Sequence, residues 1–259
     1  RTSAGKQHDL TQGSIAKTML LFALPTLGSS ILQSLNGSIN AIWVGRSLGE
    51  EALAATANGN IVMFILISFV FGFGMASTIL IGQAMGQRNT VMVKRTLGTS
   101  LGSIIPISVL LAIGGWIFAP MLLELLGTPT SAFNLALTYL RMIFIAMPVT
   151  LTFTLMMMAL RGTGDSTTPL WFIALSVAID LILTPILILG IGPFPEWGIF
   201  GAAFATAVAN AVALVGMMIN LYLRGSVLAL NKEDLRFLIP DRKIPVSYTH
   251  LTLPTSDLV

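Results

Sequence analysis

The sequence predicts an all-α, polytopic membrane protein built as a bundle of six transmembrane helices. Of its 259 residues, 54% are hydrophobic and only 10% are charged, whereas soluble domains carry about 25% charged residues. The mean hydropathy is +0.86, and the apolar residues gather in six segments that each reach the roughly 20 residues needed to cross a bilayer. The lipid bilayer is therefore the first partner that the composition implies.

Several of the six segments are longer than a bilayer requires, which implies tilted helices or helix ends that project from the membrane. Together they predict one six-helix unit over residues 1–225. The predicted spans run from Ile15 to Val44, Leu53 to Ala84, Leu97 to Ala119, Ala132 to Leu160, Pro169 to Ile191 and Ile199 to Leu223.

Small residues recur at helical spacing, with Gly98 and Gly102 in the third span and the run Gly201-Ala202-Ala203 in the sixth. Such residues let helix backbones approach closely, so both spans are expected to pack tightly against neighbours. The run Met156-Met157-Met158 in the fourth span is assigned to packing or lipid contact rather than to a drug-binding surface.

Prolines fall inside four of the six predicted spans. Each removes one backbone hydrogen bond and can bend its helix. Bends are common in membrane bundles, so each proline is either a static bend or a moving hinge, and four of them favour a protein with a cavity. The hinge candidates are Pro25, Pro106, Pro148 and Pro185.

The basic residues predict the orientation of the bundle. One side collects Arg1, Lys6, Lys17, Arg88, Lys94, Arg95, Arg161 and Arg224, whereas the other has only Arg46 and, near a helix start, Arg141. By the positive-inside rule both termini are cytoplasmic, in a multi-pass protein of the cytoplasmic membrane. Residues 1–13 lack the apolar core of a secretory signal, so the first span is expected to act as the insertion signal.

One acidic residue lies within the apolar spans. Asp180 sits near the middle of the fifth span, where a carboxylate costs about 3 kcal/mol even on lenient insertion scales. Such acids usually face a protein interior or a wet cavity and carry a coupling role. Asp180 is therefore the predicted ion-coupling residue, able to exchange a proton or to hold Na⁺ with neighbouring oxygens. The alternative is a structural carboxylate bonded to another helix.

Three spans carry polar stripes at helical spacing. These residues either line a cavity or make interhelical hydrogen bonds, and their alignment favours the cavity. The stripes are Gln33, Asn36 and Asn40 on the first span, Ser176, Asp180 and Thr184 on the fifth, and Thr206 and Asn210 on the sixth.

Enzymatic and nucleic-acid functions find little support. The chain has no cysteine, and its two histidines, His8 and His250, lie in polar end segments. It has no acid pair within the spans, no Walker-type loop and no Ser/His arrangement, so neither catalysis nor an organic cofactor is expected. The net charge of +3 is spread over helix ends rather than over one face, which argues against nucleic acid.

The composition changes after Leu223. Residues 226–245 are expected to form a cytoplasmic amphipathic connector. Residues 246–259 begin with Val246-Ser247-Tyr248-Thr249-His250. These residues match the translation of a DNA sequence that resembles a transposon-based sequencing adapter. We expect this segment to be a non-native tail and exclude it from the fold prediction.

Several motifs, taken in order, resemble the multidrug and toxic compound extrusion (MATE) family of transporters. The resemblance spans roughly Leu10 to Lys243. The motifs are Ala23-Leu24-Pro25, Ile42-Trp43-Val44-Gly45-Arg46-Ser47-Leu48-Gly49 with Ala52-Leu53-Ala54-Ala55, Gln83-Ala84-Met85-Gly86, Leu160-Arg161-Gly162-Thr163-Gly164-Asp165 with Pro169, Pro185-Ile186-Leu187-Ile188-Leu189-Gly190, and Gly198-x-x-Gly201-Ala202-Ala203-x-Ala205-Thr206.

This resemblance implies that the chain is one lobe of a two-lobed antiporter of about twelve helices. Such antiporters export small organic, often cationic, compounds in exchange for H⁺ or Na⁺. The chain matches the first lobe and the connector, so a second six-helix lobe is expected to be missing. Family members often carry an acid where this chain has Asn40, and often Asn and Asp where it has Asp180 and Thr184. The acid has therefore moved by one helical turn.

Two other functions remain open. A lipid-linked saccharide flippase of the same superfamily would need cationic groups in its cavity to hold phosphates, and only Arg141 lies near a span interior. That arginine is also explained by snorkelling to the membrane interface. A non-transporting membrane scaffold would need neither a buried acid nor polar stripes.

Overall fold

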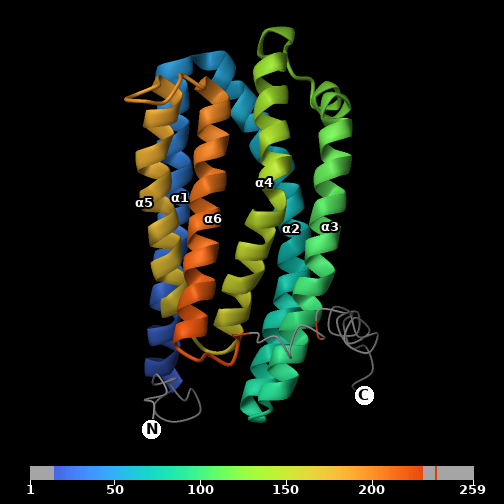
Figure 1. Ribbon diagram of the computed structural model, residues 1–259, viewed down its shortest axis with the longest axis vertical. Coiled ribbons are helices and arrows are strands. Elements are labelled where there is room, and N and C mark those ends of the chain that lie inside the picture. Colours follow the sequence, from blue (N-terminus) through green and yellow to red (C-terminus); the bar gives the residue numbers. More distant parts are fainter. Residues whose placement is uncertain (1–14, 230–236, 238–259) are drawn as a thin grey trace.

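Six helices make up the part of the chain that the computed structural model describes, which is residues 15–229 and 237 (Figure 1). All six are long and apolar enough to cross a membrane. The predicted all-helical bundle is therefore confirmed for these residues, in a multi-pass membrane protein. The helices are α1 (Ile15–Leu48), α2 (Glu50–Gly86), α3 (Thr90–Leu125), α4 (Thr130–Gly162), α5 (Thr167–Leu189) and α6 (Gly198–Leu223).

Most of the helices extend beyond the apolar segments that predicted them. The largest difference is in α3, which was predicted from Leu97 to Ala119 and observed from Thr90 to Leu125. A hydropathy criterion detects only the part of a helix that crosses hydrocarbon, whereas the backbone hydrogen bonds continue into the polar interface. The extra turns of α3 bring Lys94, Pro120 and Glu124 into the helix.

Local sequence features explain where the helices begin and end. Gly49 alone separates α1 from α2, with a φ of 86° that few side chains tolerate. Gly190 ends α5 in the left-handed conformation, with a φ of 65°. At the start of α3, the Asn89 side chain accepts a hydrogen bond from the Met92 N–H at 3.0 Å. Asp165 likewise accepts from the N–H groups of Thr167 and Thr168.

The helices form two groups that α4 joins. In Figure 1, α1, α5 and α6 lie on one side, and α2, α3 and α4 on the other. Close packing runs from α1 to α5 to α6 within the first group, and α4 packs on both α2 and α3 within the second. Because α4 also packs on α6, it is the central element, and its middle and second half contribute many fully buried side chains.

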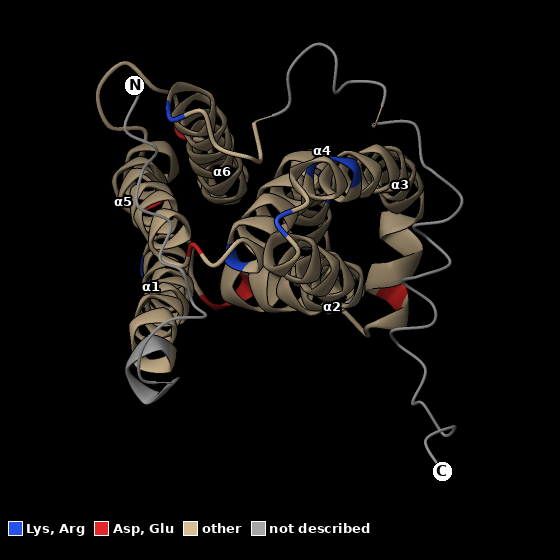
Figure 2. Cartoon of the chain, turned by 90° about the horizontal axis from the view of Figure 1, so that it is seen from below, with Lys and Arg blue, Asp and Glu red and all other residues tan. Residues whose placement is uncertain are grey.

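The two ends of the bundle differ in charge, as the basic residues predicted. We call one end the basic end, because Arg88, Lys94, Arg95, Arg161 and Arg224 lie in or beside its turns. Figure 2 looks at the bundle from this end. The opposite end carries Glu50, Glu51, Glu124 and Glu196. Since six is an even number of spans, α1 begins and α6 ends at the basic end.

All four predicted hinge prolines lie inside helices, and Pro120 is a fifth. One turn after Pro25, the Ser29 hydroxyl donates to the Pro25 carbonyl at 2.8 Å. Thr152 does the same to Pro148 at 2.7 Å. Hydroxyls that bond back by one turn often bend helices, so these pairs reinforce the effect of proline in α1 and α4. Hinge motion at these prolines stays a prediction.

Part of the predicted domain division lies outside the described residues. The predicted tail, 246–259, falls there entirely, as does most of the predicted connector, 226–245. Of the connector, residues 226–229 and Phe237 are described. Leu228 is buried, and the Phe237 backbone lies against Gly98 of α3, where a larger side chain would not fit. The described start of the connector therefore folds back onto the bundle.

Candidate functional site

Asp180 is buried in the middle of the α1, α5 and α6 group, with only 1% of its surface exposed. Its Oδ2 accepts hydrogen bonds from the side-chain amides of Asn36 and Asn40, both at 2.7 Å. Its Oδ1 accepts from the hydroxyls of Thr184 and Thr206, both at 3.1 Å. Residues from three predicted polar stripes thus meet at one carboxylate.

All four groups that donate to Asp180 are uncharged, so the carboxylate is hydrogen-bonded but has no charged partner among these donors. A buried charge normally requires a paired charge or a bound metal ion. The arrangement therefore presents one carboxylate and neutral side chains to which a small cation could bind.

The two asparagines that contact Asp180 each leave one buried acceptor unused. Among the described residues, Asn36 Oδ1 and Asn40 Oδ1 have no hydrogen-bond partner. An unsatisfied buried acceptor costs about 1–3 kcal/mol. A rotation of either amide about its side chain would turn this oxygen towards Asp180, where it could accept a proton held by the acid or ligate a hard cation.

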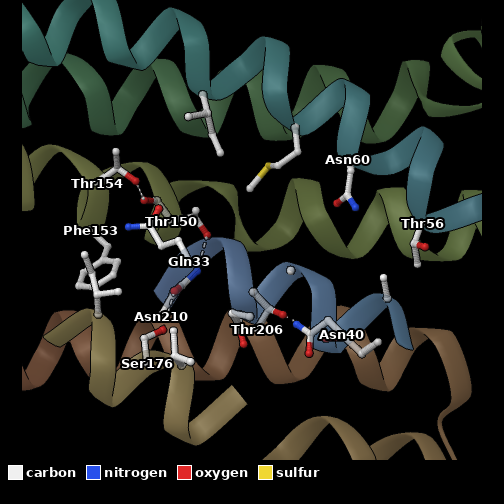
Figure 3. Close-up of a pocket in the computed structure, with 18 of the residues that line it drawn as sticks. Gln33, Asn40, Thr56, Asn60, Thr150, Phe153, Thr154, Ser176, Thr206 and Asn210 are labelled. Carbon is white, nitrogen blue, oxygen red and sulfur yellow. Dashed lines mark hydrogen bonds between the residues drawn. The ribbon is translucent and has the colours of Figure 1, made fainter. Parts of the chain in front are cut away.

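A cavity of about 380 Å³, lined by both polar and apolar side chains, lies beside Asp180 between the two helix groups. Figure 3 shows its labelled polar side chains pointing into the space from α1, α2, α4, α5 and α6. On its wall, the Ser176 hydroxyl donates to Asn210 Oδ1 at 2.9 Å. The Asn210 amide in turn donates to the Thr150 hydroxyl at 3.4 Å, so α4, α5 and α6 share one hydrogen-bond chain.

The predicted site residues form two layers, an inner layer around Asp180 and the wall of the cavity. Asp180 and Thr184 are buried and do not line the cavity, whereas the other six predicted residues do. Asn36, Asn40 and Thr206 connect the two layers, because they line the cavity and also donate hydrogen bonds to Asp180. The six predicted residues that line the cavity are Gln33, Asn36, Asn40, Ser176, Thr206 and Asn210.

Six polar or aromatic residues of the cavity were not predicted. They come from α2 and α4, and they are Thr56, Asn60, Tyr139, Thr150, Phe153 and Thr154. Two of the pairs, Thr56 with Asn60 and Thr150 with Thr154, repeat the four-residue spacing that identified the other stripes. Met157 also lines the cavity, although its run of three methionines was assigned to packing or lipid contact.

The cavity wall contains no Lys or Arg among the described residues. Arg141 instead places its guanidinium 5.0 Å from the ring centroid of Trp116 on α3, in a cation–π contact. Nor do any three His, Cys, Asp or Glu side chains within residues 15–229 and 237 gather as a metal cluster would require. A cation at Asp180 would therefore rely on one carboxylate and neutral oxygens.

Residues 25–186, well over half of the chain, match the model of the MatE family. The chain belongs to the MatE family. The relatives in this family are transporters rather than enzymes. Membership of the family also explains why the motifs around Pro25, Gly164 and Pro185 occur in this order.

The relatives of this MatE chain include transporters and multidrug resistance proteins. It is 38% identical to the probable multidrug resistance protein YoeA of Bacillus subtilis over 94% of the chain and 52% of YoeA. It is 34% identical to the FAD transporter of Shewanella oneidensis over 80% of the chain and 46% of that protein. The chain thus spans about half the length of the curated relatives it matches.

Solved structures of MatE relatives have the same fold. A transporter of the MOP superfamily from Pyrococcus furiosus superposes with a TM-score of 0.84 at 23% identity, over 95% of this chain and 53% of that one. An outward-facing multidrug resistance MATE transporter gives the same TM-score. This MatE chain therefore has the fold of one half of such a transporter.

A threonine that contacts Asp180 provides a test of the site in this MatE chain. We expect Thr206→Val, which keeps the shape but removes the hydroxyl, to lower the free energy of unfolding by about 1–2 kcal/mol. Hydrogen bonds to charged groups contribute about 1.5–3 kcal/mol, and interhelical bonds in membranes average about 0.6 kcal/mol. Thermal unfolding in detergent measures the loss. The control is Thr138→Val, at an exposed hydroxyl that bonds only within α4. Equal losses in both variants would contradict the prediction.

Proposed function

We propose that this chain forms the first half of a cation-coupled antiporter that exports organic compounds across the cytoplasmic membrane by alternating access. The observation that carries the proposal is the buried Asp180 carboxylate, which is 1% exposed and bonded only to uncharged donors. An intramembrane acid in such a setting is functional by default. Membership of the MatE family supports transport as that function.

Asp180 would couple the cation to the cavity through the residues that the two layers share. Asn36, Asn40 and Thr206 contact Asp180 and also line the cavity. When H⁺ or Na⁺ binds, the amides of Asn36 and Asn40 must reorient, because they then turn their oxygens rather than their N–H groups to the site. The wall that the substrate meets would therefore differ between the loaded and empty states, as population shift by a ligand requires.

The lining of the cavity favours small organic substrates, including cations, over phosphate-bearing ones. Its described wall combines amides and hydroxyls with Met63, Phe153 and Met157, and aromatic and methionine side chains suit apolar or cationic groups. A flippase for phosphate-linked lipids would need basic residues, and Arg141 contacts Trp116 instead. The flippase is therefore the less favoured alternative, and a non-transporting scaffold leaves the Asp180 site without a role.

The length of the relatives supports a second six-helix lobe as the partner of this chain. The chain covers about half of YoeA and of the solved MATE transporters. Alternating access in many transporters moves one structural repeat against another around a central site. Because six spans return to the side from which they began, a second lobe would start at the basic end. By the positive-inside rule that end would be cytoplasmic, as would both termini.

Cation-dependent stability tests the proposal directly. We expect NaCl, compared with KCl at equal ionic strength, to raise the Tm of the purified chain in detergent if Na⁺ is the coupling ion. If H⁺ is the coupling ion, the Tm should rise as the pH falls. A ligand at 100 times its Kd adds about 2.7 kcal/mol to the free energy of unfolding, and Asp180→Asn should remove the effect.

Glu124→Gln is the matched control, because it removes a charge at a helix end far from Asp180. It should keep the full cation response. A response that survives in Asp180→Asn would assign the cation to another site. No response to either cation in the wild type would remove Asp180 from ion coupling.

A further inference from the structure

The cavity beside Asp180 contains a second group of polar residues, about one helical turn nearer the basic end. Helices α1 and α5 begin at that end, and Ser176 lies one turn before Asp180 on α5. Gln33 lies nearly one turn before the first asparagine that contacts Asp180. Helix α6 ends at the basic end, and Asn210 lies one turn beyond Thr206. We call this group the Gln33 subsite, and it consists of Gln33, Thr150, Phe153, Met157, Ser176 and Asn210.

The Gln33 carboxamide is the free polar group of this subsite. Gln33 is exposed and lines the cavity, and no described residue forms a hydrogen bond with its side chain. The Asn210 amide is instead held on both sides, because its Oδ1 accepts from Ser176 at 2.9 Å and its Nδ2 donates to Thr150 at 3.4 Å. Figure 3 shows Gln33 and Asn210 at one end of the cavity and Thr56 at the other. One carboxamide is therefore fixed by the protein, whereas the other is available to a bound molecule.

Helix α4 provides the apolar side of the subsite. Phe153 and Met157 lie one turn apart on one face of α4, and both line the cavity although they are only 4% and 7% exposed. Because these side chains are packed on most sides, they offer a fixed surface. An aromatic ring beside a thioether favours contact with another ring. The cavity volume of about 380 Å³ is within the range of small-molecule sites, so a planar ring system can lie against α4.

The polar lining of the cavity is neutral. Among the described residues, no Asp, Glu, Lys or Arg side chain lines it. Asp180 lies behind the wall, and its two oxygens already accept four hydrogen bonds. A bound molecule therefore meets amides and hydroxyls rather than charges. Selection then depends on whether its donors and acceptors match those of the wall, because an unmatched polar group loses its hydrogen bonds to water without replacement.

A free carboxamide matches one particular kind of edge on a ligand. It presents an acceptor oxygen beside a donor N–H group in a single plane. The complementary edge has an N–H beside a C=O, as in a cyclic imide or a lactam. Glutamine reads the adjacent donor and acceptor on the edge of adenine by the same paired geometry. A ligand with only an acceptor or only a donor would leave half of the Gln33 carboxamide unpaired.

We propose that the Gln33 subsite binds planar aromatic molecules with an uncharged imide or lactam edge. The Gln33 carboxamide pairs with that edge, and the ring system lies against Phe153 and Met157. This assignment names a substrate class for the proposed transporter and rests on that function for its role in export. Binding to the chain itself is measured without transport, so the two proposals fail separately.

A matched pair of fluorescent probes tests the assignment. 1,8-Naphthalimide is planar and uncharged and carries an imide N–H between two carbonyls, whereas N-methyl-1,8-naphthalimide has a methyl group in place of that hydrogen. Equilibrium dialysis against the purified full chain in detergent gives the Kd of each, with protein-free micelles as the blank. We expect naphthalimide to bind about 5- to 10-fold more tightly than its N-methyl derivative, the lower part of the range for one bidentate pair.

Three variants separate the hydrogen-bonding edge from the ring contact. Gln33→Leu should remove the preference for naphthalimide and leave the Kd of the N-methyl derivative nearly unchanged. Met157→Ala should weaken both probes alike, because it removes ring contact only. Gln83→Leu is the matched control, since Gln83 is an exposed glutamine of α2 that does not line the cavity. It should keep the wild-type preference.

The proposal has clear contrary outcomes. Equal affinity of the wild type for the two probes, or no binding of naphthalimide, would overturn it, as would a preference that survives in Gln33→Leu. A thermal shift of each variant confirms that the bundle is folded, which is expected because Gln33 is exposed. A naphthalimide preference in a chain whose Tm responds to neither Na⁺ nor H⁺ would support this subsite and contradict ion coupling alone.

Discussion

Replacing Asp180 by Asn should strongly reduce cation-driven export while leaving the bundle folded. The amide has nearly the shape of the carboxylate and can still accept from Asn36 or Thr206, but it carries no charge to hold the ion. We expect the rate of cation-coupled transport to fall at least about 10- to 100-fold, the range already reached by loss of outer-shell partners of metal ligands. Substrate efflux from vesicles that contain the complete transporter, driven by an imposed Na⁺ or H⁺ gradient, measures the rate.

A second substitution makes this prediction specific to the position of the charge. Asn40 Nδ2 lies 2.7 Å from Asp180 Oδ2, so Asn40→Asp in the Asp180→Asn background returns a carboxylate to the same site from α1. We expect the double variant to recover part of the coupled transport. Wild-type coupling in the single variant would exclude Asp180 from the mechanism. A double variant no better than the single one would indicate that α5 itself must carry the acid.

Replacing Gly201 by Val should destabilise the bundle more than a surface change would. A Cβ at Gly201 would lie 2.7 Å from the backbone oxygen of Leu187 and 2.8 Å from its carbonyl carbon. Backbone atoms cannot move aside cheaply, so α5 and α6 would have to separate. The Leu187 oxygen also accepts from the Trp197 N–H at 3.0 Å, and this turn would be disturbed as well. Overpacking costs about 1–3 kcal/mol, which lowers the Tm by roughly 2–12 °C.

Gly72→Val is the matched control for this change. Gly72 lies within α2, and a Cβ there would meet no atom within 4 Å. Thermal unfolding in detergent compares the two variants. We expect Gly72→Val to unfold close to or slightly above the wild-type temperature, because the added side chain meets no neighbour at its Cβ and valine is a better helix former than glycine. A Tm for Gly201→Val that equals that of Gly72→Val would show that α5 and α6 do not need this close approach.

The helices were predictable from sequence because the bilayer imposes one rule on all of them. A span must bury about 20 apolar residues and satisfy its own backbone, so a local count of hydropathy is sufficient. The helix ends were less predictable, as α3 illustrates, because residues such as Lys94 and Glu124 continue the helix outside the hydrocarbon. The polar stripes were also predictable, since Asn36 and Asn40 depend only on helical spacing.

The partners of those stripes were not predictable from sequence. The residues on α2 and α4 that complete the cavity have the same spacing as the predicted stripes, yet spacing does not say which face of a helix points inward. Thr150 lines the cavity because α4 packs between α6 and α3.

The sequence by itself determined that this chain crosses the membrane six times, that its charges divide between two ends, and that Asp180 is an acid with no basic residue nearby along its helix. Only the tertiary structure decided that Asn36, Asn40, Thr184 and Thr206 surround that acid, and that it lies behind the cavity wall rather than on it. The physical reason is that a span is specified by its own transfer into lipid. A binding site is specified by contacts between residues up to 144 positions apart, and these depend on how the helices pack.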